Sequence, residues 1–450
     1  MVLLLSGCAS YNRIQNAPTT GRVALLKAPD VDSEADRSGD IWLFLAFSGG
    51  GTRAAAFSYG VLEELRDTRY SRNGSERRLL DEVDTISSVS GGSFTAAYYG
   101  LFGDRIFDDY QDVFLEKNVQ KVLINGLLNP LNWFRFMSQG FDRTEMAIDY
   151  YDRQIFRGGT FADMAAQPGP HIQINATDLS IGQRFTFSPG RFSILCSDLA
   201  EFRVARAVAA SSAVPVAFTP VVLENHDTCE VEEPDRLPRT RERAHTDPRL
   251  GELVSGLDSY LDKEERRYIH LVDGGISDNL GVRSAYDRVH ILGGAQQATK
   301  LLLGRTPSIL AMIVVNAQTR PDRPMDLSSR SPGTSAVLGA VSHAQLQRYN
   351  VESIALMQGS LNQWASELST PGHTVTPYFI QIDFESIADP ETRVLFNNVA
   401  TSLALPADEV NNLTEAGHRL LRKAPGFRGL VTHIKSLDKR DRADIAASPR

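Results

Sequence analysis

The sequence predicts an α/β fold with a mostly parallel central sheet flanked by helices. Apolar runs of strand length alternate with stretches of helical character, an order typical of a sheet covered by helices. Three of the apolar runs end directly in turns rich in glycine or serine. Hydrophobic residues make up 42% of the chain, which is enough for a sizeable core.

The individual elements follow from the apolar runs and the periodicity between them. Strands are predicted at residues 41–47, 83–89, 171–178, 183–187, 216–223, 267–272, 308–315 and 377–384. Helices are predicted near residues 52–66, 91–101, 142–154, 201–211, 282–293, 335–358 and 406–422.

The length of 450 residues is compatible with two or three domains, although single α/β domains with insertions reach this size. We expect a polar tether at residues 1–38, the main α/β domain at 39–320, and helices and strands at 321–450 that complete the fold. Residues 225–250 are rich in charge and predict a solvated loop. The charged tail from residue 436 is expected to fray.

The most informative turn is Ser-Val-Ser-Gly-Gly at residues 88–92, between a predicted strand and a predicted helix. This is the layout of a nucleophile elbow, Gly-x-Ser-x-Gly, with Ser88 in place of the first glycine. Small neighbours allow the strained bend from which the hydroxyl of Ser90 would project, at a helix N-terminus that favours negative charge. Ser90 is therefore the candidate nucleophile, although such turns also occur without any chemistry.

A second cluster, Gly49, Gly50 and Gly51, joins the predicted strand at 41–47 to a predicted helix. Its backbone N–H groups would point at an anion, which in a hydrolase is the tetrahedral oxyanion. A tight turn without a ligand is one alternative. A dinucleotide fingerprint is another, but no acidic residue ends a second strand about 20 residues further on. A P-loop is excluded because no Gly-Lys-Ser/Thr follows.

A third turn, Asp-Gly-Gly, begins at Asp273 after the predicted strand at 267–272. We expect Asp273 at the sheet edge where the carboxyl ends of parallel strands form binding sites. A serine nucleophile needs a base, and Asp273 is one candidate. None of the nine histidines follows a glycine- or serine-rich strand end. His270 lies within the strand, and its side chain should leave the opposite face.

These three turns, in this order, resemble the patatin-like phospholipase family, whose pattern is a glycine-rich oxyanion loop, a Gly-x-Ser-x-Gly serine and an Asp-Gly-Gly base. Residues 171–187 and 205–221 also resemble the family, so the similarity extends over residues 40–290. The resemblance implies a three-layer patatin-like catalytic domain. It also implies hydrolysis of acyl esters in membrane lipids, of the phospholipase A or lysophospholipase type.

On the residues that match the family pattern, the resemblance implies a Ser–Asp dyad without histidine. Ser90 would be the nucleophile and Asp273 the general base, and the N–H groups of Gly49, Gly50 and Gly51 would form the oxyanion hole. Arg53 would be structural or face an anion. No metal and no cofactor are implied.

Residues 5–8, Leu-Ser-Gly-Cys, resemble the bacterial lipobox, in which the chain is cleaved before a cysteine that becomes lipidated. The segment before Cys8 has no Lys or Arg and is shorter than the usual signal of about 7–15 apolar residues. Either the precursor is longer or the match is accidental. If real, it implies a lipid-anchored protein of the bacterial cell envelope, in the outer membrane and facing the periplasm.

The net charge of −8, without a basic stripe, argues against a nucleic-acid partner. No apolar run reaches the ~18 residues of a membrane-spanning helix, so contact with a membrane surface would be peripheral. With Cys8 set aside, Cys196 and Cys229 form a disulfide in an oxidising periplasm or remain two reduced core thiols. The oligomeric state is not predicted.

The insertion at residues 122–137 predicts two short helices divided at Pro130. Its apolar face would be formed by Leu123, Ile124, Leu127, Leu128 and Leu131. Trp133, Phe134 and Phe136, with Arg135, resemble an interfacial anchor. The segment either packs on the sheet or forms a lid or docking surface for lipid.

Two classes of function fit these observations best. The first is a serine acyl hydrolase that acts on membrane lipids. The second is a non-catalytic lipid-binding or scaffolding lipoprotein of the same fold, and a dinucleotide-binding enzyme comes third. The presence of both Ser90 and Asp273 favours the hydrolase, because a fold that has lost its activity usually lacks one member of such a pair.

Overall fold

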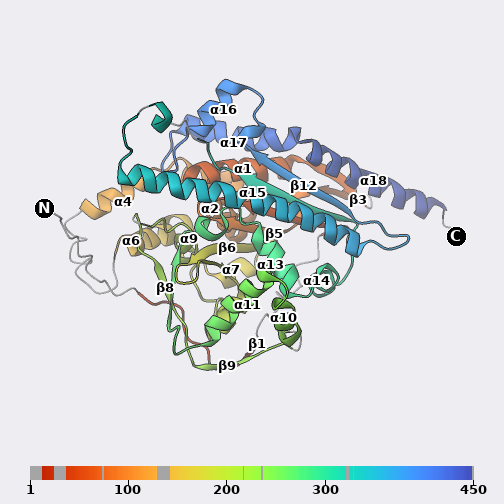
Figure 1. The fold of residues 1–450 in the computed structure, drawn as a ribbon. Helices are drawn as coiled ribbons and strands as arrows, with labels where there is room; N and C mark the ends of the chain where they lie inside the picture. The colour runs from red at the N-terminus through yellow and green to blue at the C-terminus, as the bar shows by residue number, and fades with distance from the viewer. Residues whose placement is uncertain are drawn as a thin grey trace.

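A computed structural model of the chain describes residues 13–24, 37–72, 75–128, 142–215, 217–234, 237–320, 324–327 and 329–447. Its centre is an eight-stranded sheet with the order β12-β11-β2-β5-β6-β10-β8, and β7 pairs with β6 outside this path (Figure 1). The strands are β2 (Ile41–Phe47), β5 (Val83–Val89), β6 (His171–Asp178), β7 (Gln183–Phe187), β8 (Val221–Glu224), β10 (Tyr268–Val272), β11 (Ile309–Asn316) and β12 (Thr376–Asp383).

Five neighbouring strands, from β12 to β6, run parallel to one another, whereas β7 and β10 are antiparallel to β6. The predicted α/β fold with a mostly parallel sheet is confirmed. The predicted strand at 216–223 is shorter than expected and begins at Val221 as β8.

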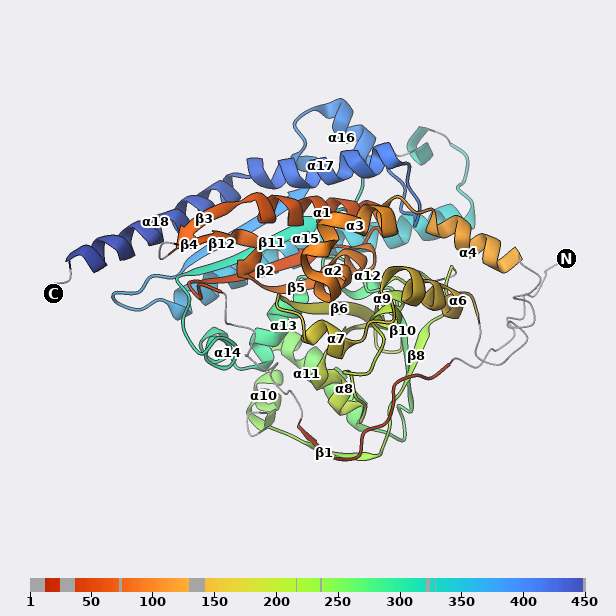
Figure 2. The same ribbon diagram turned by 180° about the vertical axis from the view of Figure 1, so that it is seen from behind.

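Helices cover both faces of the sheet, as the continuous apolar strands require (Figures 1 and 2). The main helices are α1 (Gly51–Asp67), α2 (Gly91–Phe102), α4 (Val119–Leu128), α6 (Arg143–Tyr150), α9 (Val204–Ser211), α11 (Pro248–Leu261), α13 (Arg283–Ile291), α15 (Thr334–Leu368), α16 (Pro390–Asn397), α17 (Ala407–Lys423) and α18 (Pro425–Ala447). The other helices are α3 (Ile106–Tyr110), α7 (Phe161–Ala165), α8 (Pro189–Ile194), α10 (Leu237–Ala244), α12 (Gly275–Asp278) and α14 (Ala295–Leu302).

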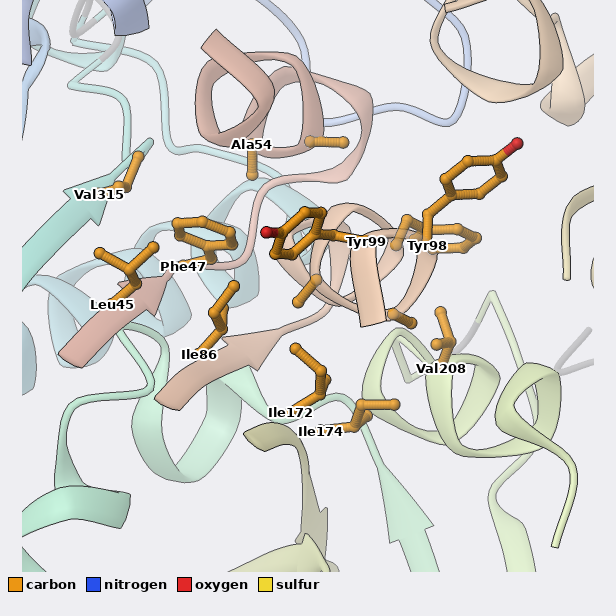
Figure 3. Packing of buried hydrophobic residues seen from close by; sticks show 14 of the residues in the cluster. Leu45, Phe47, Ala54, Ile86, Tyr98, Tyr99, Ile172, Ile174, Val208 and Val315 are labelled. Carbon is orange, nitrogen blue, oxygen red and sulfur yellow. The ribbon is translucent and has the colours of Figure 1, made fainter. Parts of the chain in front are cut away.

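Alternate residues of β2 enter two separate cores. Leu45 and Phe47 pack with Ile86 and with α1 and α2 on one face (Figure 3). Trp42 and Phe44 pack on the other face against α13 and α15, and α15 contributes Met357, Leu361, Trp364 and Leu368 at helical spacing. The strand is therefore buried on both sides, which holds its carboxyl end in a fixed place.

The close contact of α1 with α17 depends on two glycines. A Cβ atom at Gly60 would lie 1.9 Å from the carbonyl oxygen of Thr414, and one at Gly417 would lie 2.2 Å from that of Phe57. Larger residues would force the helices apart. Because α1 begins at the glycine-rich loop, this packing also positions that loop.

The prediction of a solvated loop at 225–250 is wrong. This segment contains β9 (Cys229–Glu232), α10 and the start of α11. Leu237 and Leu250 are almost completely buried, and their apolar side chains supply the packing that a solvated loop lacks. The tail from residue 436 continues α18 to Ala447 instead of fraying.

The expected tether is also partly wrong, because residues 13–24 lie against the main domain. Asn16 is almost fully buried, and its amide exchanges hydrogen bonds of 2.8 and 2.9 Å with the backbone of Glu224. Beyond it, β1 (Gly21–Ala24) pairs in parallel with β9. The amide of Asn16 thus pairs with β8 as a neighbouring strand would.

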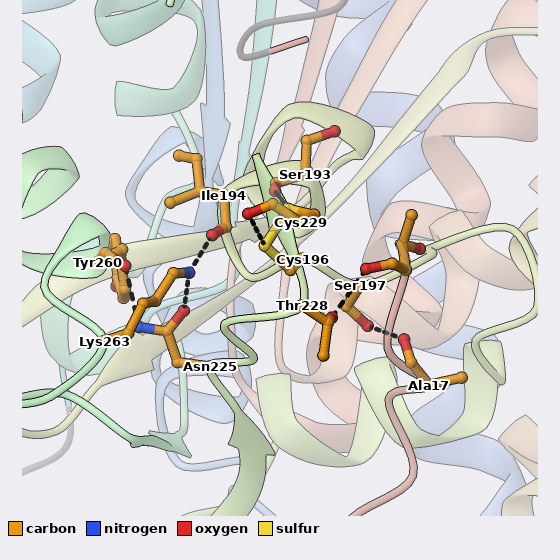
Figure 4. Close-up of a disulfide and its surroundings, with 11 residues drawn as sticks. Ala17, Ser193, Ile194, Cys196, Ser197, Asn225, Thr228, Cys229, Tyr260 and Lys263 are labelled. Carbon is orange, nitrogen blue, oxygen red and sulfur yellow. Dashed lines mark hydrogen bonds between the residues drawn. A yellow bond between two sulfur atoms is a disulfide. The ribbon is translucent and has the colours of Figure 1, made fainter. Parts of the chain in front are cut away.

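Cys196 and Cys229 are joined by a disulfide, with their Cα atoms 5.3 Å apart (Figure 4). The bond links the turn after α8 to β9, and the carbonyl of Cys196 accepts the N–H of Thr19 at 2.7 Å. The disulfide therefore lies beneath the N-terminal segment.

None of the described helices is long and apolar enough to cross a membrane.

Candidate active site

Ser90 occupies a strained turn between β5 and α2. Its φ angle is 51°, in the left-handed region that side chains other than glycine rarely adopt. A Cβ atom at Gly91 would lie 2.0 Å from the carbonyl oxygen of Gly51, and one at Gly92 would lie 2.8 Å from that of Ser48. The buried hydroxyl of Ser88 donates to the carbonyl of Gln173 at 3.0 Å, so serine fits where an elbow usually has glycine.

Asp273 lies beside Ser90, and the Ser90 hydroxyl donates a 2.8 Å hydrogen bond to its Oδ2. The other oxygen, Oδ1, accepts the N–H of Gly275 at 2.7 Å. Burial raises the pKa of Asp273 to about 6, although these two hydrogen bonds act in the opposite direction. At neutral pH the carboxylate is ionised and can accept the proton of Ser90.

Asp273 follows the carboxyl end of its strand, β10, and lies at the predicted edge beside Ser90, which follows the carboxyl end of β5. It reaches that edge from the opposite direction, because β10 is antiparallel to β6. The register pairs Val272 with Thr177 and Val89 with Asn175. The residues that follow Val272 and Val89, Asp273 and Ser90, therefore lie on either side of β6 at the same level.

Gly50 and Gly51 provide two backbone N–H groups near Ser90. Their φ angles of 143° and 59° suit glycine, and within the described part of the chain neither N–H donates a hydrogen bond. The N–H of Gly49 donates to the carbonyl of Asn279 at 3.0 Å. Of the three predicted oxyanion donors, Gly49 is therefore already used by the protein, and Gly50 and Gly51 remain available.

Arg53 supports the same loop from behind. Its guanidinium is buried and donates to the carbonyls of Ala317 at 2.9 Å and Val399 at 2.6 Å. Burial lowers its pKa to about 10, which still leaves the group charged at neutral pH. A Cβ atom at Gly50 would lie 3.1 Å from one of its terminal nitrogens. Arg53 is thus structural and also adds positive potential beside the free N–H groups.

Ser211 is a residue of the site that the sequence analysis did not single out. Its buried hydroxyl accepts the N–H of Ser90 at 2.8 Å and donates to the carbonyl of Asn175 at 2.6 Å. It therefore anchors the backbone of the elbow to β6. Ser211 lies in a stretch that resembles the family, but nothing in its spacing from Ser90 indicates this contact.

No histidine takes part in this arrangement. All nine histidines are described, and none makes a hydrogen bond with Ser90 or Asp273. The described residues also contain no group of three or more His, Cys, Asp or Glu side chains that could hold a metal ion. The candidate site in the described part of the chain thus combines a hydroxyl bonded to a carboxylate with two backbone N–H groups.

The remaining predicted residues have mixed outcomes. Cys8, Trp133, Phe134 and Phe136 lie outside the described residues. In α4, Leu123 is buried, whereas Ile124 is 47% exposed, so these two do not share one buried face as expected.

Residues 45–286 match the family model for patatin-like phospholipase. Among solved structures, human GIVD cytosolic phospholipase A2 is similar, with 11% identity, a TM-score of 0.47 and coverage of 90% of this chain and 64% of that one. VipD from Legionella pneumophila has 11% identity, a TM-score of 0.25 and coverage of 92% and 72%, respectively. The chain thus spans 64% of the length of the human protein. No curated protein matches the sequence. Because the match to the family model covers more than half of the 450 residues, the chain belongs to the patatin-like phospholipase family.

Proposed function

We propose that this protein is a serine acyl hydrolase that cleaves acyl esters of membrane lipids through a Ser90–Asp273 dyad. The observation that carries the proposal is the 2.8 Å hydrogen bond from the Ser90 hydroxyl to Asp273. A serine hydroxyl on a strained elbow, bonded to an ionisable carboxylate, is the arrangement that nucleophilic catalysis requires. The family membership supports lipid esters as the substrate class.

In the proposed reaction, the oxygen of Ser90 attacks the ester carbonyl while its proton passes to Asp273. The carbonyl oxygen becomes an oxyanion, which the N–H groups of Gly50 and Gly51 stabilise. The intermediate collapses, the alcohol leaves with the proton from Asp273, and an acyl-enzyme remains. Water then repeats the sequence, with Asp273 as base, and releases the fatty acid.

A fluorophosphonate probe tests this proposal, because only an activated serine attacks its phosphorus. We expect the full-length protein to be labelled on Ser90 and the Ser90→Ala variant to remain unlabelled. Hydrolysis of a short soluble ester should be lost in the same variant. Failure of the folded wild-type protein to react with the probe or the ester would instead support the non-catalytic lipid-binding alternative.

We also propose that the protein acts at a membrane surface. In support, exposed apolar side chains lie on segments around the site, namely Val122 and Ile124 on α4, Val394 and Leu395 on α16, and Ile276 after Asp273. The α4 helix is tied to the loop after α16, because the Ser402 hydroxyl donates to Gln120 at 2.8 Å. That loop adjoins the oxyanion loop, since the carbonyl of Ser402 accepts the N–H of Thr52 at 2.8 Å.

A lipid anchor at Cys8, in the outer membrane of a bacterial cell envelope and facing the periplasm, remains part of this proposal. The Cys196–Cys229 disulfide supports an oxidising compartment. Mass spectrometry of the mature N-terminus tests the anchor: a lipidated Cys8 is expected, and an unmodified Met1 would contradict it.

The role of the exposed apolar side chains around the site can be tested separately from the chemistry at Ser90. We expect Val122→Ser with Ile124→Ser, or Trp133→Ala with Phe136→Ala, to lower activity on phospholipid vesicles and to spare a short soluble ester. Equal loss on both substrates would mean that these side chains do not act at a membrane surface.

A further inference from the structure

Asn279 joins the two loops that carry the proposed oxyanion donors and the proposed base. It caps the C-terminus of α12, six residues after Asp273 in the chain. Its backbone carbonyl accepts the N–H of Gly49 at 3.0 Å, a contact between residues far apart in the sequence. Asn279 is therefore attached through its backbone to the start of the glycine-rich loop.

The side-chain amide of Asn279 lies between the same two loops. A Cβ atom at Gly49 would be 2.7 Å from Oδ1 of Asn279 and 3.3 Å from Cβ of Ser90. A Cβ atom at Gly275 would be 3.0 Å from Oδ1 of Asn279 and equally 3.0 Å from Oδ1 of Asp273. One amide thus fills the space beside both members of the dyad, and it does so only because Gly49 and Gly275 have no side chains.

The sheet alone does not hold these loops together. The glycine-rich loop follows β2 and the Asp273 loop follows β10, with β5 and β6 between them. Three strand spacings correspond to about 14 Å, so the separation of the loops depends on contacts made beyond the strand ends. Catalytic groups must keep their places to within about 0.5 Å to remain productive.

The amide of Asn279 also has no competing structural partner. Among the described residues this amide has no hydrogen-bond partner, and Asn279 is only partly buried. The side chain is therefore not committed to a network elsewhere in the core. Its Oδ1 instead occupies the space where Cβ atoms at Gly49 and Gly275 would lie.

We propose that Asn279 is a positioning residue that sets the separation between the oxyanion donors and the base across Ser90. The inference rests on the proposed function, because it concerns the geometry of that reaction. Its backbone bond fixes Gly49, and its amide acts as a spacer between Gly49 and Gly275. Asn279 itself transfers no proton and forms no bond with the substrate.

Asn279→Ala isolates the spacer, because the backbone bond to Gly49 is retained. We expect kcat for a short soluble ester to fall about 10–100-fold, with KM nearly unchanged, since small displacements of catalytic groups cost rate more than binding. Gly49→Ala should be equally impaired, because its methyl group meets the Asn279 amide. The double variant should recover part of the activity lost in Gly49→Ala, because that obstacle is then absent.

Asn279→Asp provides a second readout. It places a carboxylate beside Asp273, and the repulsion should move the acid limb of kcat/KM to higher pH. Asn316→Asp is the control, because Asn316 ends β11, which lies four strand spacings, or about 19 Å, from β10. An unshifted limb in Asn279→Asp, or full activity in Asn279→Ala, would overturn the proposal.

Hydrogen exchange separates this inference from the proposed function. Amides of residues 48–54 should exchange faster in Asn279→Ala than in the wild-type protein, whether or not the protein hydrolyses esters. Unchanged exchange in Asn279→Ala would show that Asn279 does not hold the loop. If the wild type hydrolyses no ester and exchange is faster in Asn279→Ala, the positioning role of Asn279 is supported and the proposed hydrolase function is contradicted.

Discussion

Two buried aspartates of the central sheet, Asp84 and Asp273, illustrate the difference between a structural and a reactive carboxylate. Asp84 accepts the backbone N–H of Leu43 at 2.7 Å and pairs with Arg37 at 3.2 Å. Asp273 accepts one backbone N–H and the hydroxyl of Ser90. Burial raises the pKa of both, to about 7 for Asp84 and about 6 for Asp273. A raised pKa therefore does not distinguish the reactive carboxylate from the structural one. The bonded groups do, because among them only the Ser90 hydroxyl can become a nucleophile.

Backbone strain gives the same lesson. Besides Ser90, the described residues Arg157 and Cys196 also have positive φ angles without being glycine. Arg157 pairs with Asp109 and Cys196 is in a disulfide, so neither carries a hydroxyl bonded to a buried carboxylate. The candidate site is thus marked by the coincidence of strain, an ionisable partner and unused N–H groups, and by no single one of them.

The largest difference in kcat is expected between variants that lack the Asp273 carboxylate and variants that lack the Asp84 carboxylate. Asp273→Asn and Ser90→Ala should each lower kcat for a soluble ester by at least about 10³-fold, and the double variant should be little worse. Asp84→Asn should keep kcat and lower thermal stability at pH 8, because Arg37 loses its partner. Circular dichroism checks the folding of each variant. Near-normal turnover in Asp273→Asn would mean that another residue is the base.

A smaller effect is expected from adding a side chain to the glycine-rich loop that carries the proposed oxyanion donors. Gly50→Val puts a side chain on a residue with φ of 143° and should displace its N–H, at a cost of about 10²–10³ in kcat with little change in KM. Gly182→Val is the matched control, because Gly182 also has a positive φ but nothing lies within 4 Å of an added Cβ. Equal losses of kcat in both variants would point to strain instead of a missing donor.

Much of this architecture follows from sequence pattern alone. The strand at residues 41–47 and the helix that begins after the glycine cluster are predictable, because a continuous apolar run and a glycine-rich turn are local signals. The pairing of Ser90 with Asp273 was implied by the family resemblance, and the structure brings the two side chains together.

Other features depend on contacts that no local pattern encodes. The antiparallel direction of β10 and its register against β6 are set by the whole sheet. The bond from Ser211 to the backbone of Ser90 joins residues 121 positions apart. The engagement of the Gly49 N–H by Asn279 likewise removes one predicted oxyanion donor through a contact between distant loops.

The pH profile sharpens the comparison of the two aspartates. Asp273 must be ionised to accept a proton, and its pKa is raised to about 6, so kcat/KM should fall as the pH drops through about 6. Asp84 also titrates near neutrality, but Asp84→Asn should leave this acid limb where it is. The profile is measured with a soluble ester between pH 4 and 9. If Asp84→Asn shifts the acid limb of kcat/KM, the titrating group is Asp84 and not Asp273.

The smallest effect on activity is expected at the disulfide, which lies with the N-terminal segment away from the dyad. A bridge across a sequence separation of 33 residues constrains the unfolded chain, and its loss should lower the free energy of unfolding by about 3 kcal/mol. Cys196→Ser with Cys229→Ser should therefore unfold at lower denaturant concentration and keep kcat below the transition.

A loss of kcat in the folded double serine variant would contradict this separation of scaffold and site. The contacts that could transmit such a loss are known: Arg206 of α9 bonds the side chain of Gln15 at 3.0 Å, and α9 ends at Ser211, which holds the backbone of Ser90. Arg206 is also paired with the buried Glu145 at 2.7 Å, a bond that does not involve the N-terminal segment. Because this pair and the burial of α9 do not depend on the N-terminal segment, the disulfide should stabilise the fold without tuning the reaction.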